Sequence, residues 1–445
     1  MRQLIYMLSL IGFIETMVFL LYAIRYYIFS FIILKTRTPS NNNFSELSKN
    51  SDAFITILLP TYNEQNVIDR LLTACTSFDF SNYEVILIDD SIDESMKTIM
   101  KWKNHPRLKI IHRTSRDGWK GGALNIGLTH VNPQSTHSLI LDADFVPPKN
   151  LLQRFLTRFT DDQIVVVQGY QVHDLNAEEN WITKGVRVMF SVTNMIEMNA
   201  KNKLKLLLPI TGSVYMIRTE LLKKLRFDKS ITEDWSLTLK LYMAGYKVIY
   251  DPTLTASAEC SNTLLKFFRQ NARWAEGHTR NFRKYFWEIL KNKGLSVREK
   301  LEFLFLGSLY LNTILIVTTT IGGILVLGSD PNLTYSLNLT PTILSIFFTI
   351  VGILSVVFAD IVALKSEGCS SDLPKIPYSL ILGYITTPIT AYYSLKGLLS
   401  DKGHFHRTYK TGKITKPSIL SYLRELFRSK FSPHKLQTDR NPLTL

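Results

Sequence analysis

Residues 54–64 read FITILLPTYNE, an apolar run that ends in a polar turn, and the pattern recurs at 84–90 (EVILIDD) and 138–144 (SLILDAD). Short runs rich in Ile, Val and Leu, without polar alternation, are typical of strands buried on both faces of a parallel sheet. Helical stretches separate these runs, so the order predicts repeated strand–helix–strand units. We therefore expect an α/β fold, with a mostly parallel sheet covered by helices on both faces.

The expected elements alternate between residues 54 and 159. Strands are expected at 54–59, 84–88, 108–112 and 138–141, and helices at 64–76, 93–102, 120–128 and 149–159. In such sheets ligands bind beyond the carboxyl ends of the strands. Polar motifs that directly follow a strand are therefore the first candidates for a functional site.

Apolar segments flank this region on both sides. Residues 4–34 form a run interrupted only by Glu15 and Arg25, which is long enough to cross a bilayer. A cleavable signal peptide is the alternative, but the run is long and has no A-x-A-like cleavage site. Lys35 and Arg37 follow it, which by the positive-inside rule places the next segment in the cytosol. Further apolar segments follow at 303–327, 342–364 and 376–399.

These features divide the chain into six expected regions. They are an N-terminal transmembrane helix (1–37), a linker (38–52), a cytosolic domain (53–262), a basic, aromatic helical stretch (263–300), membrane helices (301–399) and a basic tail (400–445). The helical stretch suits either the membrane surface or ordinary packing. The segment 376–399 contains Pro377 and Pro388 and is either a span or a re-entrant or interfacial segment. The charge of the tail favours the cytosol.

Charge and cysteine content indicate the kind of partner and the cellular compartment. The formal net charge of +15 indicates an anionic partner or surface. No recognised nucleic-acid motif accompanies it, so a cytoplasmic membrane leaflet or a nucleotide diphosphate is favoured over nucleic acid. The three cysteines, Cys75, Cys260 and Cys369, lack zinc-site spacing and do not suggest a disulfide framework. The main domain is expected in a reducing compartment.

Two acidic motifs follow neighbouring expected strands. Asp89 and Asp90 end one strand, and Asp142 and Asp144 follow another. Carboxylates, together with water and phosphate oxygens, suit Mg²⁺ or Mn²⁺. The alternative is that these acids are helix caps and turn residues.

The segment 117–125, DGWKGGALN, lies between the two acidic motifs. Glycines before a helix start offer backbone N–H groups to phosphate, and Lys120 adds a mobile cation. The segment matches neither a P-loop nor a dinucleotide-binding fingerprint. A simple turn with a helix start is the alternative.

Two later motifs offer a base and a diphosphate-binding group. In residues 232–234 (TED) an acid can act as general base on an acceptor hydroxyl; the alternative is an N-cap for a helix at 235–244. Gln270, Arg273 and Trp274 lie within about one helical turn, where the Arg can pair with diphosphate and the Trp can stack on a sugar ring. An amphipathic helix with a buried Trp is the alternative.

The ordered set of motifs resembles family 2 glycosyltransferases. It comprises PTYNE (60–64), DD (89–90), KGGALN (120–125), DAD (142–144), TGS (211–213), TED (232–234) and QNARW (270–274). It is most similar to membrane synthases of cellulose, hyaluronan, chitin oligosaccharides and poly-N-acetylglucosamine. The resemblance covers about residues 54–290. It implies a GT-A-like domain, with a mostly parallel sheet, inserted between transmembrane helices.

The resemblance also implies roles for individual residues. The donor-binding residues would be Thr61, Tyr62, Glu64, Asp89, Asp90, Lys120, Asp142, Gln270 and Arg273. Asp144, with Asp142, would hold Mg²⁺ or Mn²⁺. Gly212, Ser213 and Trp274 would contact the acceptor, and Asp234, beside Glu233, would be the general base.

One further resemblance lies in the tail. Residues 405–410, FHRTYK, are similar to the F-x-V-T-x-K gating loop of cellulose synthase, with Arg407 in place of the Val. The resemblance implies that Thr408 and Lys410 close over the donor diphosphate. A basic segment lying on anionic lipid is the alternative.

The implied function is inverting, metal-dependent transfer of sugar from a UDP- or GDP-sugar to a growing polysaccharide. The enzyme would be a multi-pass protein of the cell membrane with a cytosolic catalytic domain. The first alternative is transfer of a single sugar to a lipid acceptor, which the small number of spans favours. A non-catalytic membrane scaffold is the second alternative, although every named acid is present.

Overall fold

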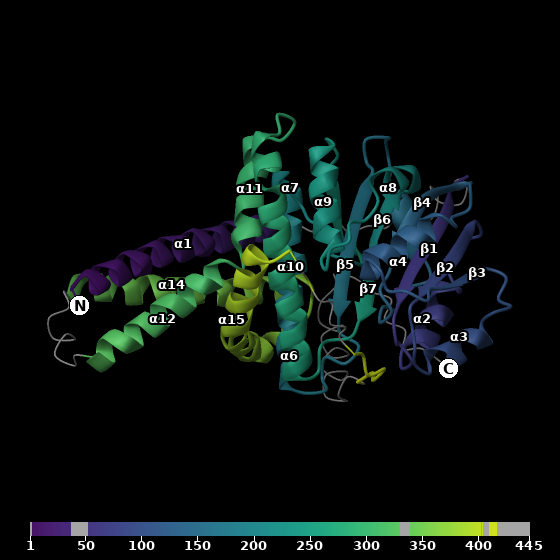
Figure 1. The fold of residues 1–445 in the computed structure, drawn as a ribbon. Coiled ribbons are helices and arrows are strands. Elements are labelled where there is room, and N and C mark those ends of the chain that lie inside the picture. Colours follow the sequence, from purple (N-terminus) through teal and green to yellow (C-terminus); the bar gives the residue numbers. More distant parts are fainter. Residues whose placement is uncertain (1, 37–51, 330–338, 402, 404–408, 416–445) are drawn as a thin grey trace.

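A seven-stranded sheet forms the centre of the fold in this computed structural model, which describes residues 2–36, 52–329, 339–401, 403 and 409–415 (Figure 1). The strands are β1 (Phe54–Thr61), β2 (Tyr83–Asp89), β3 (Leu108–His112), β4 (Ser135–Ile140), β5 (Val166–His173), β6 (Tyr215–Arg218) and β7 (Val248–Ala258). Their order is β3-β2-β1-β4-β6-β5-β7. Only β6 runs antiparallel to its neighbours, β4 and β5. The expected mostly parallel α/β sheet is confirmed.

The sheet separates two apolar cores. Alternate residues of β1 point to opposite faces, because successive side chains of a strand alternate. Ile57 and Leu59 pack in one core with Leu71 of a covering helix, whereas Leu58 packs in the other with Leu124. A central strand buried on both faces therefore reads as a continuous apolar run, which explains the sequence of residues 54–59.

Helices cover both faces of the sheet. They are α2 (Ile68–Cys75), α3 (Ser95–Lys101), α4 (Trp119–Leu128), α5 (Leu151–Leu156), α6 (Trp181–Ser191), the π-helix η1 (Val192–Met198), α7 (Asn199–Leu204), α8 (Thr219–Leu225) and α9 (Glu233–Met243). Beyond this layer, α10 (Leu264–Lys291) packs against α9, and α11 (Val297–Ser308) packs against α10. Each expected helix is present, but α2 starts four residues later than the expected range 64–76. Glu64 accepts the backbone N–H groups of Val67 and Ile68, so residues 64–67 form a turn that leads into the helix.

Three long helices extend away from the sheet (Figure 1). They are α1 (Arg2–Lys35), α12 (Asn312–Ser329) and α14 (Leu339–Ser366). Two segments, Leu10–Lys35 and Ile346–Ser366, are long and apolar enough to span a membrane. The bent pair α11 and α12, which meet at 46°, adds a third if it forms one span. Among the described residues, these are the candidate spans.

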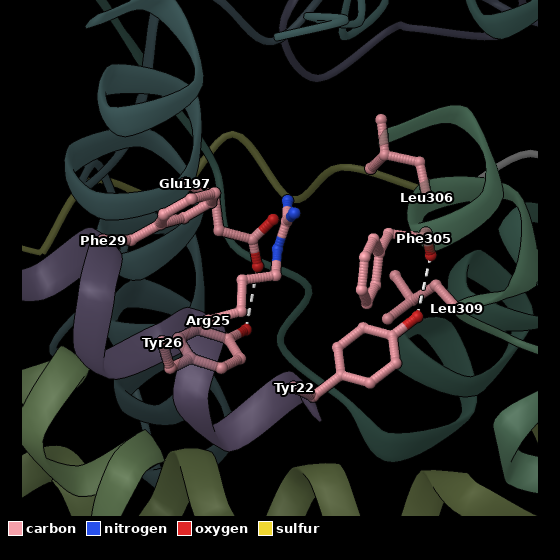
Figure 2. A pocket seen from close by; sticks show the side chains of 8 residues that line it. All are labelled: Tyr22, Arg25, Tyr26, Phe29, Glu197, Phe305, Leu306 and Leu309. Carbon is pink, nitrogen blue, oxygen red and sulfur yellow. Dashed lines mark hydrogen bonds between the residues drawn. The ribbon is translucent and has the colours of Figure 1, made fainter. Parts of the chain in front are cut away.

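Polar contacts attach α1 to α11 and η1. The Arg25 guanidinium donates two hydrogen bonds of 2.6 Å to Glu302 of α11. Tyr26 donates to Glu197 of η1, and Tyr22 donates to the Phe305 carbonyl, at 2.8 and 2.7 Å (Figure 2). Several of these side chains line a small, mostly apolar cavity between the three elements, together with Phe29, Leu306 and Leu309.

The last helix that the structure describes, α15 (Ile376–Leu399), lies against α10 and α6. Among the described residues, α15 is not one of the candidate spans. Thr279 of α10 and Ser394 of α15 share a hydrogen bond of 2.9 Å. Arg280 of α10 donates to the Ser400 carbonyl just beyond α15. These contacts hold the end of α15 against α10.

Candidate active site

Three of the motifs meet at one lysine. The Lys120 ammonium, on the first turn of α4, lies 2.6 Å from Asp142 Oδ1 and 3.4 Å from Glu233 Oε1. It also donates to the Gly212 carbonyl at 2.7 Å. The KGGALN, DAD, TGS and TED motifs, which are up to 114 residues apart in the sequence (Lys120 to Asp234), therefore form one site at the carboxyl end of the sheet.

The TGS loop has an unusual backbone. Gly212 has a φ of +84° and Val214 a φ of +55°. The left-handed region is strained for a β-branched residue, and such strain tends to collect at functional sites. Ser213 Oγ accepts a hydrogen bond of 2.9 Å from the Asp142 backbone N–H, which fixes the DAD and TGS motifs to each other.

The TED motif opens α9, with Thr232 at the N-cap position. The Thr232 side chain makes no capping bond to the helix; instead, Asn281 of α10 donates to both the Thr232 carbonyl and its hydroxyl. The motif thus holds the N-cap position that the alternative expects, and its two acids at the start of α9 also face the Lys120 site.

Asp234 has the electrostatics of a general base. One carboxylate oxygen, Oδ1, accepts from the Trp235 N–H at 2.8 Å, while Oδ2 faces Gly212. A methyl group at Gly212 would lie 3.1 Å from that oxygen. Burial, and then the neighbouring Glu233, raise the pKa of Asp234 to about 7, against a smaller opposing effect of Lys120. A carboxylate with this pKa both accepts and releases a proton near neutral pH.

The second acid of the DAD motif is paired with the tail. Asp144 is 5% exposed, and its Oδ2 lies 2.7 Å from the Lys410 ammonium. Burial, the largest single effect, raises the pKa of Asp144, but the charge and hydrogen bond of Lys410, with smaller effects of His173 and the Glu259 N–H, together hold this pKa below its ordinary value. Lys410 thus lies at the DAD motif, whereas Thr408 lies outside the described residues.

These carboxylates fit a divalent cation that also binds substrate phosphates. Asp144 already attracts a cationic group, and the Asp142 side chain is 38% exposed. In the described part of the chain, no group of three or more His, Cys, Asp and Glu side chains is arranged to hold a metal alone. In nucleotide-binding sites, Mg²⁺ is commonly held by one or two carboxylates together with substrate phosphate oxygens and water.

The first acidic motif has a different environment. Asp89 is fully buried and accepts hydrogen bonds from Thr61 Oγ1, Ser91 Oγ and Ser91 N–H, and its Oδ2 is 3.1 Å from His112 Nδ1. Asp90 receives two hydrogen bonds from Arg113, at 2.6 and 2.5 Å. Sequence analysis missed Arg113, which follows β3 at the same sheet edge.

The remaining donor candidates lie along the same edge. The Arg116 guanidinium stacks 3.4 Å above the ring of Tyr62, a cation–π contact. Arg116 was also missed; it belongs to the loop before α4 and carries no motif of its own. Glu64 is buried and anchors the turn before α2.

The QNARW motif lies on α10, which packs across the TED loop. Arg273 donates to the Ile231 carbonyl at 3.1 Å, directly before the TED motif. Gln270 accepts from Ser261 Oγ at 2.8 Å, and the Trp274 ring lies edge-on to Phe190 at 6.2 Å. Arg273 therefore joins the Asp234 side of the site, whereas Gln270 contacts the segment after β7 and Trp274 packs against α6.

Comparison with known sequences identifies the family. Residues 52–277, half of the chain, match the sequence profile described as "Glycosyltransferase like family 2". The Arabidopsis thaliana protein named "Probable glucomannan 4-beta-mannosyltransferase 10" is 24% identical over 271 residues, which cover 58% of this chain and 49% of that protein. "Glucomannan 4-beta-mannosyltransferase 1" of Oryza sativa subsp. japonica is 23% identical over 279 residues, covering 60% and 53%. The chain thus spans about half the length of the curated relatives it matches.

A solved structure supports the fold. The mannosyltransferase PcManGT from Pyrobaculum calidifontis, in complex with GDP-Man and Mn²⁺, superposes with a TM-score of 0.58 at 19% identity, over 87% of this chain and 99% of that one. This likeness confirms the GT-A-like architecture. With the profile match covering the sheet and every motif from PTYNE to QNARW, the chain belongs to glycosyltransferase-like family 2.

Proposed function

We propose that this enzyme transfers a sugar from a nucleotide-sugar donor to a glycan acceptor at the membrane, with inversion at the anomeric carbon. The observation that carries the proposal is the convergence on Lys120. Its ammonium touches the DAD, TGS and TED motifs at once, so donor-binding and base-bearing groups share one site.

In the proposed mechanism, Asp234 accepts the proton of the acceptor hydroxyl through Oδ2, the oxygen that faces Gly212. The acceptor oxygen then forms a bond to the anomeric carbon while the bond to the nucleoside diphosphate breaks. Lys120 stabilises the charge that develops on the leaving diphosphate. A single displacement of this kind inverts the anomeric carbon, and it requires no second carboxylate as nucleophile.

Asp144 and Asp142 are the residues that we propose for Mg²⁺ or Mn²⁺. Such a cation, when bound, neutralises the diphosphate as a Lewis acid. Thr61, Tyr62, Glu64, Asp90, Gln270 and Arg273 are proposed to bind the donor, and the fully buried Asp89 to support that part of the site from within the sheet. Gly212, Ser213 and Trp274 are proposed to contact the acceptor. Glu233 supports the base through its effect on the pKa of Asp234.

We propose GDP-mannose as the donor and a β-linked mannan as the product, made processively. The support is the naming of the relatives as glucomannan 4-beta-mannosyltransferases and the GDP-Man bound to PcManGT. The catalytic domain (53–262) is proposed to lie in the cytosol of a multi-pass membrane protein. The segment 409–415 contacts that domain, which supports a tail on the same side of the membrane.

Transfer of one sugar to a lipid is the second candidate. One observation favours it: the described residues contain two candidate spans, or three with the bent pair. A narrow polymer channel needs more helices than these unless protomers associate.

The test is donor turnover by the purified full-length protein in detergent or vesicles. A panel of UDP- and GDP-sugars is supplied with Mn²⁺ or Mg²⁺, and release of nucleoside diphosphate and product length are measured. Metal-dependent release from GDP-mannose with a long product is expected. A single-sugar lipid product would establish the second candidate, and release only from a UDP-sugar would refute the mannosyl proposal.

A further inference from the structure

The short segment before the TED motif, residues 226–231, lies directly against α4. The Asn125 side-chain amide of α4 donates to the Phe227 carbonyl at 2.8 Å and accepts the Phe227 N–H at 2.9 Å. One residue position further along the segment, the Asp228 carbonyl oxygen would lie 2.7 Å from a methyl group added at Gly121. The helix of the KGGALN motif and the segment that leads into α9 are therefore in close contact, and no side chain fits between them at Gly121.

The carboxylate of Asp228 connects this segment with the two helices that follow it. Asp228 Oδ2 accepts from Ser236 Oγ of α9 at 2.6 Å and from the Tyr285 hydroxyl of α10 at 2.5 Å. Two ammonium groups complete the set, because Lys240 of α9 lies 3.0 Å from Oδ1 and Lys284 of α10 lies 2.9 Å from Oδ2. Asp228 thus joins the segment 226–231, α9 and α10 through four donors.

These donors hold Asp228 as an anion in a partly enclosed position, where 26% of its side chain is exposed. Burial raises the pKa of this carboxyl, but the hydrogen bonds from two hydroxyls and two ammonium groups together hold the pKa below its ordinary value. Lys240 also donates to the Leu225 and Arg226 carbonyls, at 2.7 and 2.5 Å. Charge-assisted hydrogen bonds are short and directional, so this network fixes α9 relative to the segment before it.

The position of α9 determines where the proposed base lies. Ser236, which contacts Asp228, follows Asp234 by two residues near the start of α9. A general base must lie within hydrogen-bond reach of the proton that it accepts. A displacement of about 1 Å in such a group can lower a rate by about 10²-fold. The contacts that hold α9 against α4 therefore also fix Asp234 relative to Lys120.

We infer that Asp228 is a positioning residue for the transfer reaction: it holds the start of α9 against α4 and α10, and so sets where Asp234 meets the acceptor hydroxyl. The inference rests on the proposed function, in which Asp234 is the general base. The four donors around the Asp228 carboxylate belong to α9 and α10, so Asp228 acts on the reacting atoms only through Asp234. Residues that act as a unit have non-additive effects on turnover.

The experiment is a double-mutant cycle between Asp228 and Asp234. It measures kcat for release of nucleoside diphosphate by the purified full-length protein with Mn²⁺ and the donor that supports turnover. Asp228→Asn keeps the shape of the side chain and removes its charge, and we expect it to lower kcat by about tenfold to 10²-fold, with little change in GDP affinity. In the Asp234→Asn background the same substitution should lower the residual kcat little, because no base remains to be positioned.

Ser236→Ala is the milder second variant. It removes one hydrogen bond and leaves the other three donors of Asp228 in place. We expect a smaller loss of kcat than in Asp228→Asn, again only where Asp234 is present. If Asp228→Asn does not yield folded protein in thermal unfolding, the cycle with Ser236→Ala decides between the same outcomes.

The matched control is Asp251→Asn. Asp251 lies near the amino end of β7, away from the carboxyl edge of the sheet, and is likewise held by partners, the Arg158 guanidinium and the Thr253 N–H. Its loss should lower thermal stability, and any effect on kcat should be the same with and without Asp234.

Two results would overturn this inference alone. One is an equal factor of loss for Asp228→Asn in the wild-type and Asp234→Asn backgrounds, as for the control. The other is wild-type kcat in both Asp228→Asn and Ser236→Ala while Asp234→Asn is impaired. Full turnover by Asp234→Asn would instead overturn the base assignment of the proposed function, and the inference with it.

Discussion

The two acidic strand ends of this sheet contrast in how their carboxylates are neutralised. At the end of β2, Asp89 is held by hydroxyl and backbone donors, and Asp90 by a two-fold Arg113 contact. At the end of β4, Asp142 and Asp144 are each paired with a lysine, Lys120 and Lys410 respectively. The carboxylates of the first pair belong to a fixed hydrogen-bond network, whereas the charges of the second pair are balanced by two flexible lysine side chains.

This difference separates the scaffold of the site from its chemistry. Arginine forms rigid, planar contacts with carboxylates, whereas lysine is a point charge on a flexible stem. Ligands that carry charge can displace or share a lysine with little rearrangement. The β4 end is therefore the part of the edge that we expect to change when donor binds, and the β2 end the part that stays fixed.

The sharpest test of the comparison is Asp234→Asn. Loss of a general base lowers turnover about 10²- to 10⁴-fold, and we expect kcat to fall by that factor while GDP affinity changes little. Release of nucleoside diphosphate and GDP binding by calorimetry measure the two effects. Asp117→Asn is the control, because Asp117 is 69% exposed and paired with the surface residue Lys229. Full activity of Asp234→Asn would show that Asp234 is not the general base.

Lys120→Met tests whether the lysine that joins the motifs contributes to turnover. The variant removes the cation that joins Asp142, Gly212 and Glu233, so kcat should fall about 10²-fold, as when a preorganised donor to a developing charge is lost. Lys229→Met, on an exposed side chain, should behave as wild type. If both variants had the same turnover and GDP affinity, Lys120 would not be part of the donor site.

Much of this arrangement could be predicted from the sequence, and the rest could not for identifiable reasons. Apolar runs fix buried parallel strands, so β1 to β4 and the acids that follow them were foreseeable. Glu259 follows β7, whose sequence (residues 248–258, VIYDPTLTASA) mixes polar residues and Pro252 with apolar ones and so lacks the continuous apolar run of β1; its strand-end position was therefore missed. The partners Arg113 and Arg116 depend on which loops meet in space, and no spacing in the sequence encodes that.

Asp89→Asn tests the other half of the comparison, through stability. An amide cannot accept all the hydrogen bonds that Asp89 receives, so the free energy of unfolding should fall by about 1–3 kcal/mol. Thermal unfolding in detergent measures the loss, and GDP affinity of the folded protein should change little. Asp69→Asn is the control, since Asp69 is exposed and its side-chain oxygen still accepts from Trp102. A large loss of GDP affinity at unchanged stability would make Asp89 a donor-binding residue instead.

The pH dependence of kcat/KM gives the smallest expected effect. Asp234 must be ionised to accept a proton, and its pKa is raised to about 7 by burial and by Glu233. Activity should therefore rise with pH through 7, by about tenfold from pH 6 to pH 8, and then level off. Because Lys120 lowers this pKa, Lys120→Met should move the midpoint to higher pH, whereas Lys229→Met should leave it in place. A midpoint near pH 4 in the wild type would mean that Asp234 is an ordinary carboxylate, and the two ends of the sheet would then not differ in proton chemistry.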